Sequence, residues 1–363
     1  RSAPPGDELR LAPGEYRLER TLEVDKALTL VGAGVEETRL SSTSARALLR
    51  YTGEGRLRLR GIAFEHRGEQ PATVVSVEAG EVRAKDCQFT GGVSMGARQG
   101  APPFGAGLAI WGEADGGLVQ SCRLAHNEAV GLGVAGHGIP EIRNNRLEAN
   151  GRSGLVFTDG AAGSAHGNVI ADNGQHGVAV GELASPRLAG NTIRGNGLNG
   201  IHFQRGASGK VRDSTVAGNG LNGVSIAGRA DPEVSGNRLR HNRKAGLAYF
   251  DKAGGTVTGN AVRSNGYHGV WLAGEAAPAV TDNEVEENGR HGMAYTGRAG
   301  GRAEGNRLAH NGGNGLLVRE RAAPDLLGNT LSRNGESGLL VAGRGTPLVR
   351  DNRADGNGQH GLA

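Results

Sequence analysis

The sequence is poor in aromatic residues, since Phe, Trp and Tyr make up 4% of its 363 residues. A broad globular core needs such large side chains, so their scarcity argues against one and is compatible only with a narrow core. Cysteine is limited to Cys87 and Cys122, which is too few for a disulfide framework, and we expect two buried thiols. No apolar run approaches the length of about 18 residues that a membrane span needs.

Lysine is also rare, because only five of the 41 basic residues are lysines. The net charge is +4 and the isoelectric point is about 9.3. An arginine bias is typical of a GC-rich genome, and a nucleic-acid-binding surface would gather its charge on one stripe. A nucleic acid is therefore not the expected partner. The sequence also lacks a Cys/His metal motif, a phosphate-binding loop and a Ser-His-Asp arrangement, so we expect neither a metal site nor a cofactor.

Glycine, by contrast, is abundant at 65 residues, and part of it is strictly periodic. A glycine that opens the motif Gly-apolar-x-apolar recurs every 23 residues from Gly131 to Gly361. An asparagine keeps the same step from Asn127 to Asn357. A fixed period over this many copies, without insertions, predicts a stack of identical coils.

Each repeat has the pattern of short strands joined by turns. In residues 140–162, segments 140–147 and 154–157 have strand-like patterns, and residues 148–151 suit a turn because Asn and Gly tolerate positive φ. We predict an all-β, single-stranded parallel β-helix, or β-solenoid, with coils of about 23 residues. Stacked asparagines should bond to one another along it. A second asparagine column is interrupted only at Ser214, where we expect a local gap or a bound water.

A period of 46 residues underlies the period of 23. The third residue after the periodic glycine alternates between large and smaller side chains, as in Phe157 and Val180. The loop before the next strand alternates between proline and glycine, as in Pro232 and Gly255, until Pro347 breaks the alternation at the last coil. Both patterns indicate a unit of two coils, in which large and small side chains interdigitate along the axis.

The repeat also suggests the domain organisation. Residues 1–106 are less regular and are predicted to form irregular N-terminal coils and a cap, with a loop insertion at residues 91–106. Residues 107–363 are predicted to form regular coils of one continuous solenoid domain. The last coil has no evident cap, and an open strand edge can pair with another chain. End-to-end self-association is therefore among the interactions we expect.

These features resemble the pectin-lyase-like superfamily of right-handed parallel β-helices, in particular its Asn/Gly-rich repeats of carbohydrate-binding and sugar-hydrolase type. The segments 9–16 and 28–34 look like the N-terminal coils of that superfamily. The resemblance implies that the β-helix is right-handed. It also implies a function among polysaccharide lyases, glycoside hydrolases, alginate C5-epimerases, and binding or scaffold modules. The epimerases' Asp-Pro-His signature is absent, since its nearest counterpart is Asp231-Pro232-Glu233.

Asp282, Glu284 and Glu286 are the best candidates for catalysis. Alternation along one strand predicts all three on its outer face, neighbours about 7 Å apart, with Arg307 beside Glu284 and Arg263 beside Glu286. Carboxylates flanked by arginines resemble the layout of polysaccharide lyases, which use Arg or Lys as base and acids to hold Ca²⁺. The spacing would also suit an inverting hydrolase. The alternative is a solvated surface of ion pairs, which contributes little energy.

A second group combines aromatic and basic side chains on neighbouring coils. Trp271 should point outward, and Tyr267 precedes it by one turn. Such a surface could stack a sugar ring, although single exposed aromatics are common. Histidine shares its column with Asn and Ser, which favours a turn-capping role for it. The candidate ligand-binding residues are Trp271, Tyr267, His268, Arg290, His291, Lys244 and His202.

A basic patch follows the same part of the chain and could bind an acidic polysaccharide or phosphate groups. Its alternative is a mixed surface, partly neutralised by Glu284 and Glu286. The residues of the patch are Arg238, Arg240, His241, Arg243, Lys244 and Arg263.

The leading hypothesis is a non-catalytic binding or scaffold module that engages a carbohydrate or a protein along its lateral face. The alternative is a polysaccharide lyase, hydrolase or uronate epimerase, and only a lyase would require Ca²⁺. The sequence begins at Arg1 and shows no signal peptide, and one that was removed would leave no trace. We take a secreted or extracytoplasmic location as the expectation.

Overall fold

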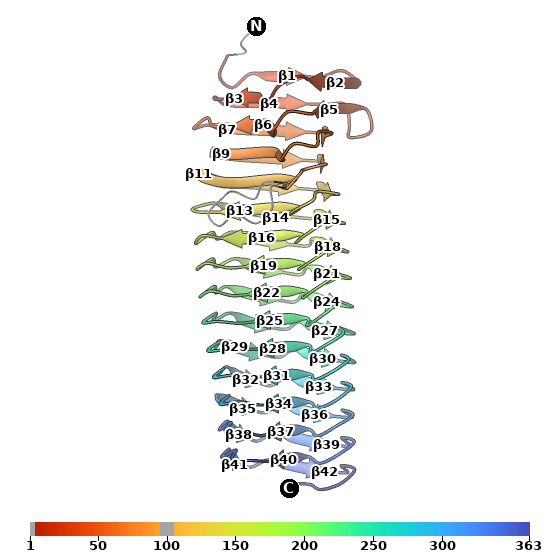
Figure 1. Ribbon diagram of the computed structural model, residues 1–363, viewed down its shortest axis with the longest axis vertical. Helices are drawn as coiled ribbons and strands as arrows, with labels where there is room; N and C mark the ends of the chain where they lie inside the picture. Colours follow the sequence, from red (N-terminus) through yellow and green to blue (C-terminus); the bar gives the residue numbers. More distant parts are fainter. Residues whose placement is uncertain (1–3, 95–104) are drawn as a thin grey trace. The chain divides into compact units, whose positions relative to one another are not determined.

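The computed structural model describes residues 4–94 and 105–363. Every regular element in these ranges is a β-strand, as predicted, and none of these residues forms a helix that could cross a membrane. The chain forms two compact units, one of Arg1–Ala179 with Leu183–Arg187 and one of Val180–Glu182 with Leu188–Ala363. In each unit the strands stack on their counterparts in neighbouring coils (Figure 1). The fold is a β-solenoid.

In the second unit each regular coil contributes three short strands, and each strand pairs in parallel with the strand 23 residues further on. The first column consists of β22 (Ile201–Phe203), β25 (Val224–Ile226), β28 (Leu247–Tyr249), β31 (Val270–Leu272), β34 (Met293–Tyr295), β37 (Leu316–Val318) and β40 (Leu339–Val341). The second column consists of β23 (Lys210–Arg212), β26 (Glu233–Ser235), β29 (Thr256–Thr258), β32 (Ala279–Thr281), β35 (Arg302–Glu304), β38 (Asp325–Leu327) and β41 (Leu348–Arg350). The third column consists of β21 (Thr192–Arg194), β24 (Thr215–Ala217), β27 (Arg238–Arg240), β30 (Ala261–Arg263), β33 (Glu284–Glu286), β36 (Arg307–Ala309), β39 (Thr330–Ser332) and β42 (Arg353–Asp355).

The first unit has the same three columns. Its regular coils contain β12 (Arg123–Ala125), β13 (Leu132–Ala135), β14 (Ile139–Arg143), β15 (Arg146–Glu148), β16 (Leu155–Thr158), β17 (Ser164–His166) and β18 (Val169–Ala171). The strands before them are β1 (Glu8–Arg10), β2 (Gly14–Leu18), β3 (Leu22–Val24), β4 (Leu28–Val31), β5 (Thr38–Ser42), β6 (Arg46–Tyr51), β7 (Arg56–Arg60), β8 (Ala63–His66), β9 (Ala72–Lys85), β10 (Gln88–Thr90) and β11 (Leu108–Gln120). Two further strands, β19 (Val178–Val180) and β20 (Arg187–Ala189), contain residues of both units.

The N-terminal coils are unequal in length. Leu9 pairs with Leu30, and Leu30 pairs with Leu59, so the step between coils differs from the regular 23 residues. Strands β9 and β11 are long because each runs through a corner that the regular coils leave to a turn, so β9 pairs with both β6 and β7. Of the predicted insertion at 91–106, residues 95–104 lie outside the described residues.

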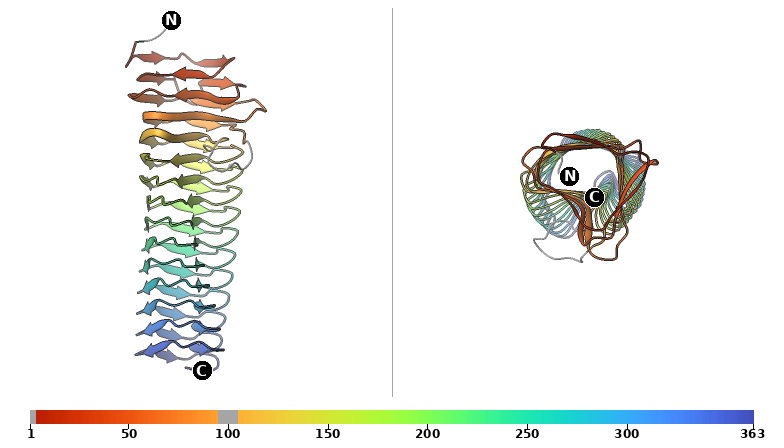
Figure 2. Two further views of the ribbon diagram at one scale, coloured as in Figure 1. Left: turned by 60° about the vertical axis from the view of Figure 1, so that its left-hand side comes forward. Right: turned by 90° about the horizontal axis from the view of Figure 1, so that it is seen from above.

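The core occupies the inside of the coils. Within each unit the coils wind round an interior (Figure 2). The apolar side chains that alternate inward along each strand are buried. Val270, Leu272, Val280 and Val285 illustrate one coil, since all four are fully buried. The interior is narrow, which agrees with the scarcity of aromatic residues.

The predicted asparagine ladders are present. The Asn265 amide Nδ2 donates to Asn288 Oδ1 at 3.0 Å, and the Asn265 backbone N–H donates to the same oxygen at 3.1 Å. The same amide also donates to the carbonyl oxygen of Leu239 at 3.0 Å. These bonds satisfy polar groups that would otherwise be buried without partners.

The predicted gap at Ser214 is wrong. The Ser214 hydroxyl accepts the backbone N–H of Asn191 at 3.2 Å and donates to the carbonyl of Arg212 at 2.9 Å. The Ser214 N–H in turn donates to Asn237 Oδ1 at 2.9 Å. A hydroxyl can both accept and donate, so serine continues the ladder.

The alternation of proline and glycine has a steric cause. Gly255 has φ of 102° and Gly301 has φ of 82°, a region that glycine occupies readily. A Cβ on Gly255 would lie 2.2 Å from the Pro232 carbonyl oxygen, and one on Gly301 would lie 2.3 Å from that of Pro278. These glycines follow a proline on the preceding coil and have no room for a side chain, which accounts for the two-coil period. The period ends at Pro324, which is followed by Pro347 on the next coil.

Candidate functional site

Trp271 lies on β31 in the second unit and points outward, as predicted, with its ring half-buried. Its ring packs edge-on against Phe250, with centroids 5.1 Å apart, and lies 6.0 Å from the ring of Tyr267. Its indole N–H donates to the Thr296 hydroxyl at 3.3 Å. These contacts hold the ring in place and leave only part of its surface available to a ligand.

Lys244, Tyr267 and Arg290 occupy the same position of three successive coils, and we call them the cationic row. Lys244 Nζ lies 5.9 Å from the Tyr267 ring centroid, and Arg290 Cζ lies 5.2 Å from it. The Arg290 guanidinium also donates to the Tyr267 hydroxyl. Both cations are exposed, whereas Tyr267 is half-buried. The row therefore presents two fixed positive charges to solvent, with the aromatic ring between them.

His268 and His291 lie beneath this row and are buried. The Nδ1 atom of His268 accepts the backbone N–H of His291 at 3.4 Å, and that of His291 accepts the N–H of Asn314 at 2.9 Å. Burial, with nearby positive charge, lowers the pKa of His268 to about 3 and that of His291 to about 4. Both imidazoles are therefore neutral near pH 7 and bond to the turn backbone, as the turn-capping interpretation predicted.

The pocket beside Trp271 is small, with a volume of about 30 Å³. Such a volume accommodates a water molecule, whereas ligand pockets usually measure about 300–1,000 Å³. A ligand must therefore bind to the surface of this group and not inside it. His202, the remaining candidate, lies on β22, three coils before Trp271. The structure does not bring His202 into the group.

Two of the acidic candidates, Glu284 and Glu286, form a network of ion pairs with Arg263 and Arg307 on the third column. Glu284 pairs with Arg263 and lies 3.6 Å from Arg307. Glu286 pairs with Arg307 and lies 3.3 Å from Arg263. The register places Glu284 beside Arg307 and Glu286 beside Arg263, as predicted. A substrate would have to displace these ion pairs before either carboxylate could act as an acid or a base.

Asp282 is not part of this network, which corrects the predicted position. Strand β33 begins at Glu284, and Asp282 lies in the preceding turn with φ of 55°. Its exposed side chain therefore does not share the strand face of Glu284 and Glu286. The alternation assumed for one continuous strand fails here because a corner of the coil intervenes. A catalytic role for the acidic residues remains a prediction.

The predicted basic patch lies on the third column and the turn after it. Arg240 on β27 pairs in register with Arg263 on β30. Within residues 4–94 and 105–363, Arg263 is the member of the patch that forms ion pairs with carboxylates. Arg238, Arg240, Arg243 and Lys244 are exposed. The glutamates therefore neutralise one end of the patch and leave the end next to Lys244 positive.

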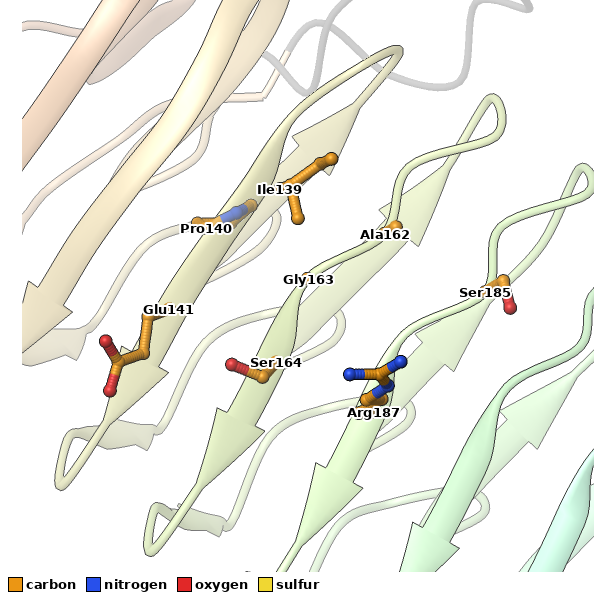
Figure 3. Close-up of a pocket in the computed structure, with 8 residues that line it drawn as sticks. All are labelled: Ile139, Pro140, Glu141, Ala162, Gly163, Ser164, Ser185 and Arg187. Atoms are coloured by element: carbon orange, nitrogen blue, oxygen red, sulfur yellow. The ribbon is translucent and has the colours of Figure 1, made fainter.

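A separate pocket of about 300 Å³ lies on the first unit. Figure 3 shows Glu141, Ser164 and Arg187 projecting from three successive coils, with Ile139 beside them. Glu141 forms an ion pair with Arg143 at 3.3 Å and lies 3.2 Å from Nε2 of His166, so its charge is partly matched. The sequence analysis did not single out these residues because each fits the repeat. The structure shows that one of them, Ile139, is 65% exposed.

Cys87 and Cys122 are free thiols and both are buried, as expected. Each Sγ lies 3.2 Å from the carbonyl oxygen two residues earlier, and burial raises the pKa of Cys122. Among the described residues, no group of three or more His, Cys, Asp or Glu side chains is placed to hold a metal ion.

The family model described as the right-handed beta helix region matches residues 39–193, 184–323 and 268–363. The chain belongs to the right-handed β-helix family. No curated protein matches the sequence. The handedness that the resemblance implied is thus shown, together with the parallel β-helix fold.

Solved structures of similar fold include two alginate-modifying enzymes. The mannuronan C-5 epimerase AlgE6 A-module of Azotobacter vinelandii is 17% identical with a TM-score of 0.57, and the match covers 94% of this chain and 91% of that one. A variant of the periplasmic alginate epimerase AlgG is 14% identical with a TM-score of 0.62, covering 95% of this chain and 78% of that one. At 17% and 14% identity, the similarity establishes the fold and nothing about activity.

The tripeptide nearest to the epimerase signature is structural in this right-handed β-helix. Pro232 lies against Gly255 in the stacked loops. Glu233 lies 2.7 Å from Lys210 Nζ and also pairs with Arg212. Hydrogen bonds from these two cations lower the pKa of Glu233. Its carboxylate is therefore an ionised member of a surface ion-pair group.

Proposed function

We propose that this right-handed β-helix binds an acidic polysaccharide along the edge formed by the cationic row. The observation that carries the proposal is the alignment of Lys244, Tyr267 and Arg290 on successive coils. Adjacent parallel strands are about 4.8 Å apart, so the two cations of the row lie about 9.6 Å apart along the axis, with Tyr267 between them. A polymer with one carboxylate per sugar unit complements such a row.

The surroundings of the row support an extended, negatively charged ligand. Arg243 precedes Lys244, and Arg240 lies on the same coil, so exposed positive charge continues round the corner. The pocket of about 30 Å³ under Trp271 is too small for a sugar ring, which favours surface binding over enclosure. AlgE6 and AlgG, which share the fold, are named for their action on mannuronan and alginate. We therefore choose a polyuronate as the first ligand to test.

Binding is measured by calorimetry or affinity electrophoresis with polymannuronate, polygalacturonate and neutral dextran. The charged polymers should bind and dextran should not, and added salt should weaken the binding by screening. The double variant Lys244→Gln/Arg290→Gln should bind at least about tenfold more weakly, which corresponds to about 1.4 kcal/mol. The matched control is Arg229→Gln/Lys252→Gln, which removes the same charges from exposed loop positions. Equal losses in the two double variants would contradict the proposal.

The same polymers separate binding from catalysis. A polysaccharide lyase, hydrolase or uronate epimerase acting through Glu284 and Glu286 would produce unsaturated ends, shorter chains or C5-inverted residues. Unsaturated ends are followed by absorbance with and without Ca²⁺, and the other products by NMR. We expect no turnover because both carboxylates are paired with arginines. Turnover that disappears in Glu284→Gln would overturn the non-catalytic proposal.

A further inference from the structure

A pocket of about 380 Å³ lies on the N-terminal coils of the first unit, apart from all of the groups described above. Residues of β3, β6, β9 and β11 line it, so it spans four coils. Its volume falls within the range usual for small-molecule sites, about 300–1,000 Å³. Trp111, which the sequence analysis did not single out, forms part of its wall.

A β-bulge positions Trp111 at this pocket. Ile110 pairs with Val77, and Glu113 pairs with Ala79, so Trp111 and Gly112 together oppose the single residue Glu78. Gly112 has φ of 70°, and a Cβ on it would lie 2.8 Å from the Glu78 carbonyl oxygen. Bulges re-aim side chains and often occur beside functional sites. Here the bulge places the indole beside the Ser76 hydroxyl.

A continuous chain of hydrogen bonds fixes the polar groups of the pocket. The Trp111 indole N–H donates to the Ser76 hydroxyl at 3.0 Å, and that hydroxyl donates to Glu78 Oε1 at 3.2 Å. Arg50 donates from Nε and Nη2 to the two oxygens of Glu78, at 2.7 Å and 2.6 Å. Because each group is held by the next, a ligand would find its partners already ordered.

The charges of the pocket balance one another. Arg50 is neutralised by Glu78 and lies 3.5 Å from Glu23, and Arg46 supplies a second cation opposite these two carboxylates. A charged ligand would have to compete with the bidentate Arg50–Glu78 pair, which is a strong interaction. A sugar hydroxyl needs no such competition, since it can donate to a free lone pair of the carboxylate and accept from the guanidinium.

We propose that this pocket binds a neutral pyranose unit. The apolar C–H face of the sugar packs against Trp111, and its hydroxyls hydrogen bond to Arg50 and Glu78. The site does not depend on the cationic row, which lies in the second unit and selects for negative charge. With this pocket, the protein has two proposed carbohydrate sites, one for an acidic and one for a neutral sugar.

The experiment uses the fact that Trp111 and Trp271 are the only tryptophans of the chain. In the variant Trp271→Phe the tryptophan emission reports on Trp111 alone. We titrate this variant with glucose, mannose, galactose and xylose, and with glucuronate and galacturonate. A neutral sugar should change the emission in a saturable manner, and the uronates should bind more weakly. A result in which no neutral sugar binds, or in which the uronates bind more tightly, overturns the proposal.

Variants then test the polar partners. Arg50→Gln and Glu78→Gln, in the Trp271→Phe background, should each weaken binding of the neutral sugar at least about tenfold, or about 1.4 kcal/mol. Arg58→Gln, an exposed arginine on β7, is the matched control and should bind as the parent does. Saturation-transfer NMR on the unmodified chain gives an independent answer if a variant does not fold. Adding Lys244→Gln and Arg290→Gln to the Trp271→Phe background should leave this binding unchanged, so the two proposals can fail separately.

Discussion

His268 and His291 stack inside the second unit with ring centroids 5.1 Å apart and ring planes 14° from parallel. Each ring occupies the place that asparagine has in other coils, and each accepts a backbone N–H through Nδ1. That role requires an unprotonated Nδ1 atom. Burial lowers the pKa of both rings, to about 3 and about 4. An imidazole in an unfolded chain has a pKa of about 6.5.

The stability of the protein should therefore fall as the pH is lowered from 7 to 4. In this range the unfolded chain binds protons that the two folded imidazoles do not bind, which shifts the equilibrium toward unfolding. Each ring contributes at most about 1.4 kcal/mol per pH unit. Urea denaturation at several pH values measures the slope. The double variant His268→Asn/His291→Asn should flatten it, whereas His310→Asn, at an exposed position, should not. Equal slopes in both variants would contradict this explanation.

Replacing Tyr249 or Tyr295 by phenylalanine should stabilise the protein. Both rings are fully buried, and in the described part of the chain neither hydroxyl has a hydrogen-bond partner. A buried, unsatisfied polar group costs about 1–3 kcal/mol. We expect Tyr295→Phe to raise the unfolding free energy by about 1 kcal/mol or more. Tyr267→Phe, which removes a hydroxyl bonded to Arg290, is the contrasting variant and should give no gain.

Asn260 should tolerate serine better than alanine. Its Oδ1 accepts both the backbone N–H and the amide of Asn237, at 2.9 Å and 3.0 Å. Asn260→Ala would leave the Asn237 backbone N–H buried without a partner, at a cost of about 1–3 kcal/mol, whereas the Asn237 amide keeps its bonds to the Val211 and Ser235 carbonyls. Asn260→Ser supplies the hydroxyl that already continues the ladder at Ser214. Thermal unfolding of the two variants should rank alanine as the less stable, and the reverse order would refute the ladder argument.

Gly255 should be intolerant of alanine, because the added Cβ would lie 2.2 Å from the Pro232 carbonyl oxygen. Gly259 is the matched control, since it also has positive φ but has open space around the Cβ position. Asp213 and Asp282 adopt similar φ values at the corresponding turns of other coils. We therefore expect Gly259→Asn to be nearly neutral and Gly255→Ala to reduce the unfolding temperature clearly. Similar unfolding temperatures for the two variants would show that the loop shifts to accommodate the added Cβ at Gly255.

The repeat predicted the fold because its period alone determines which residues stack. The strand columns, the asparagine ladders and the pairing of Glu284 with Arg307 all follow from adding 23. The position of Asp282 did not follow, since alternation was extended across a corner where the backbone adopts positive φ. The gap expected at Ser214 was wrong because the pattern identified a missing amide without considering what a hydroxyl could accept.

The pocket beside Trp111 was missed for a different reason. It lies where coils have unequal lengths and where a bulge sets two residues opposite Glu78, and neither feature repeats. A period carries no information about such a place. The remaining signal in the sequence was composition, because Trp111 is one of only two tryptophans. Packing of the rings around Trp271 likewise depends on side-chain orientation that the spacing does not determine.

The contact between Gly255 and Pro232 also restricts how the protein can change in length during evolution. Loss of one coil, such as residues 255–277, would set Pro232 against Pro278, a pairing that occurs once in the regular coils, at Pro324 and Pro347. Loss of residues 232–277 would instead bring Gly209 before Pro278 and restore an accepted neighbour. Relatives should therefore differ in length by even numbers of coils more often than by odd numbers, so the usual inherited unit is a pair of coils.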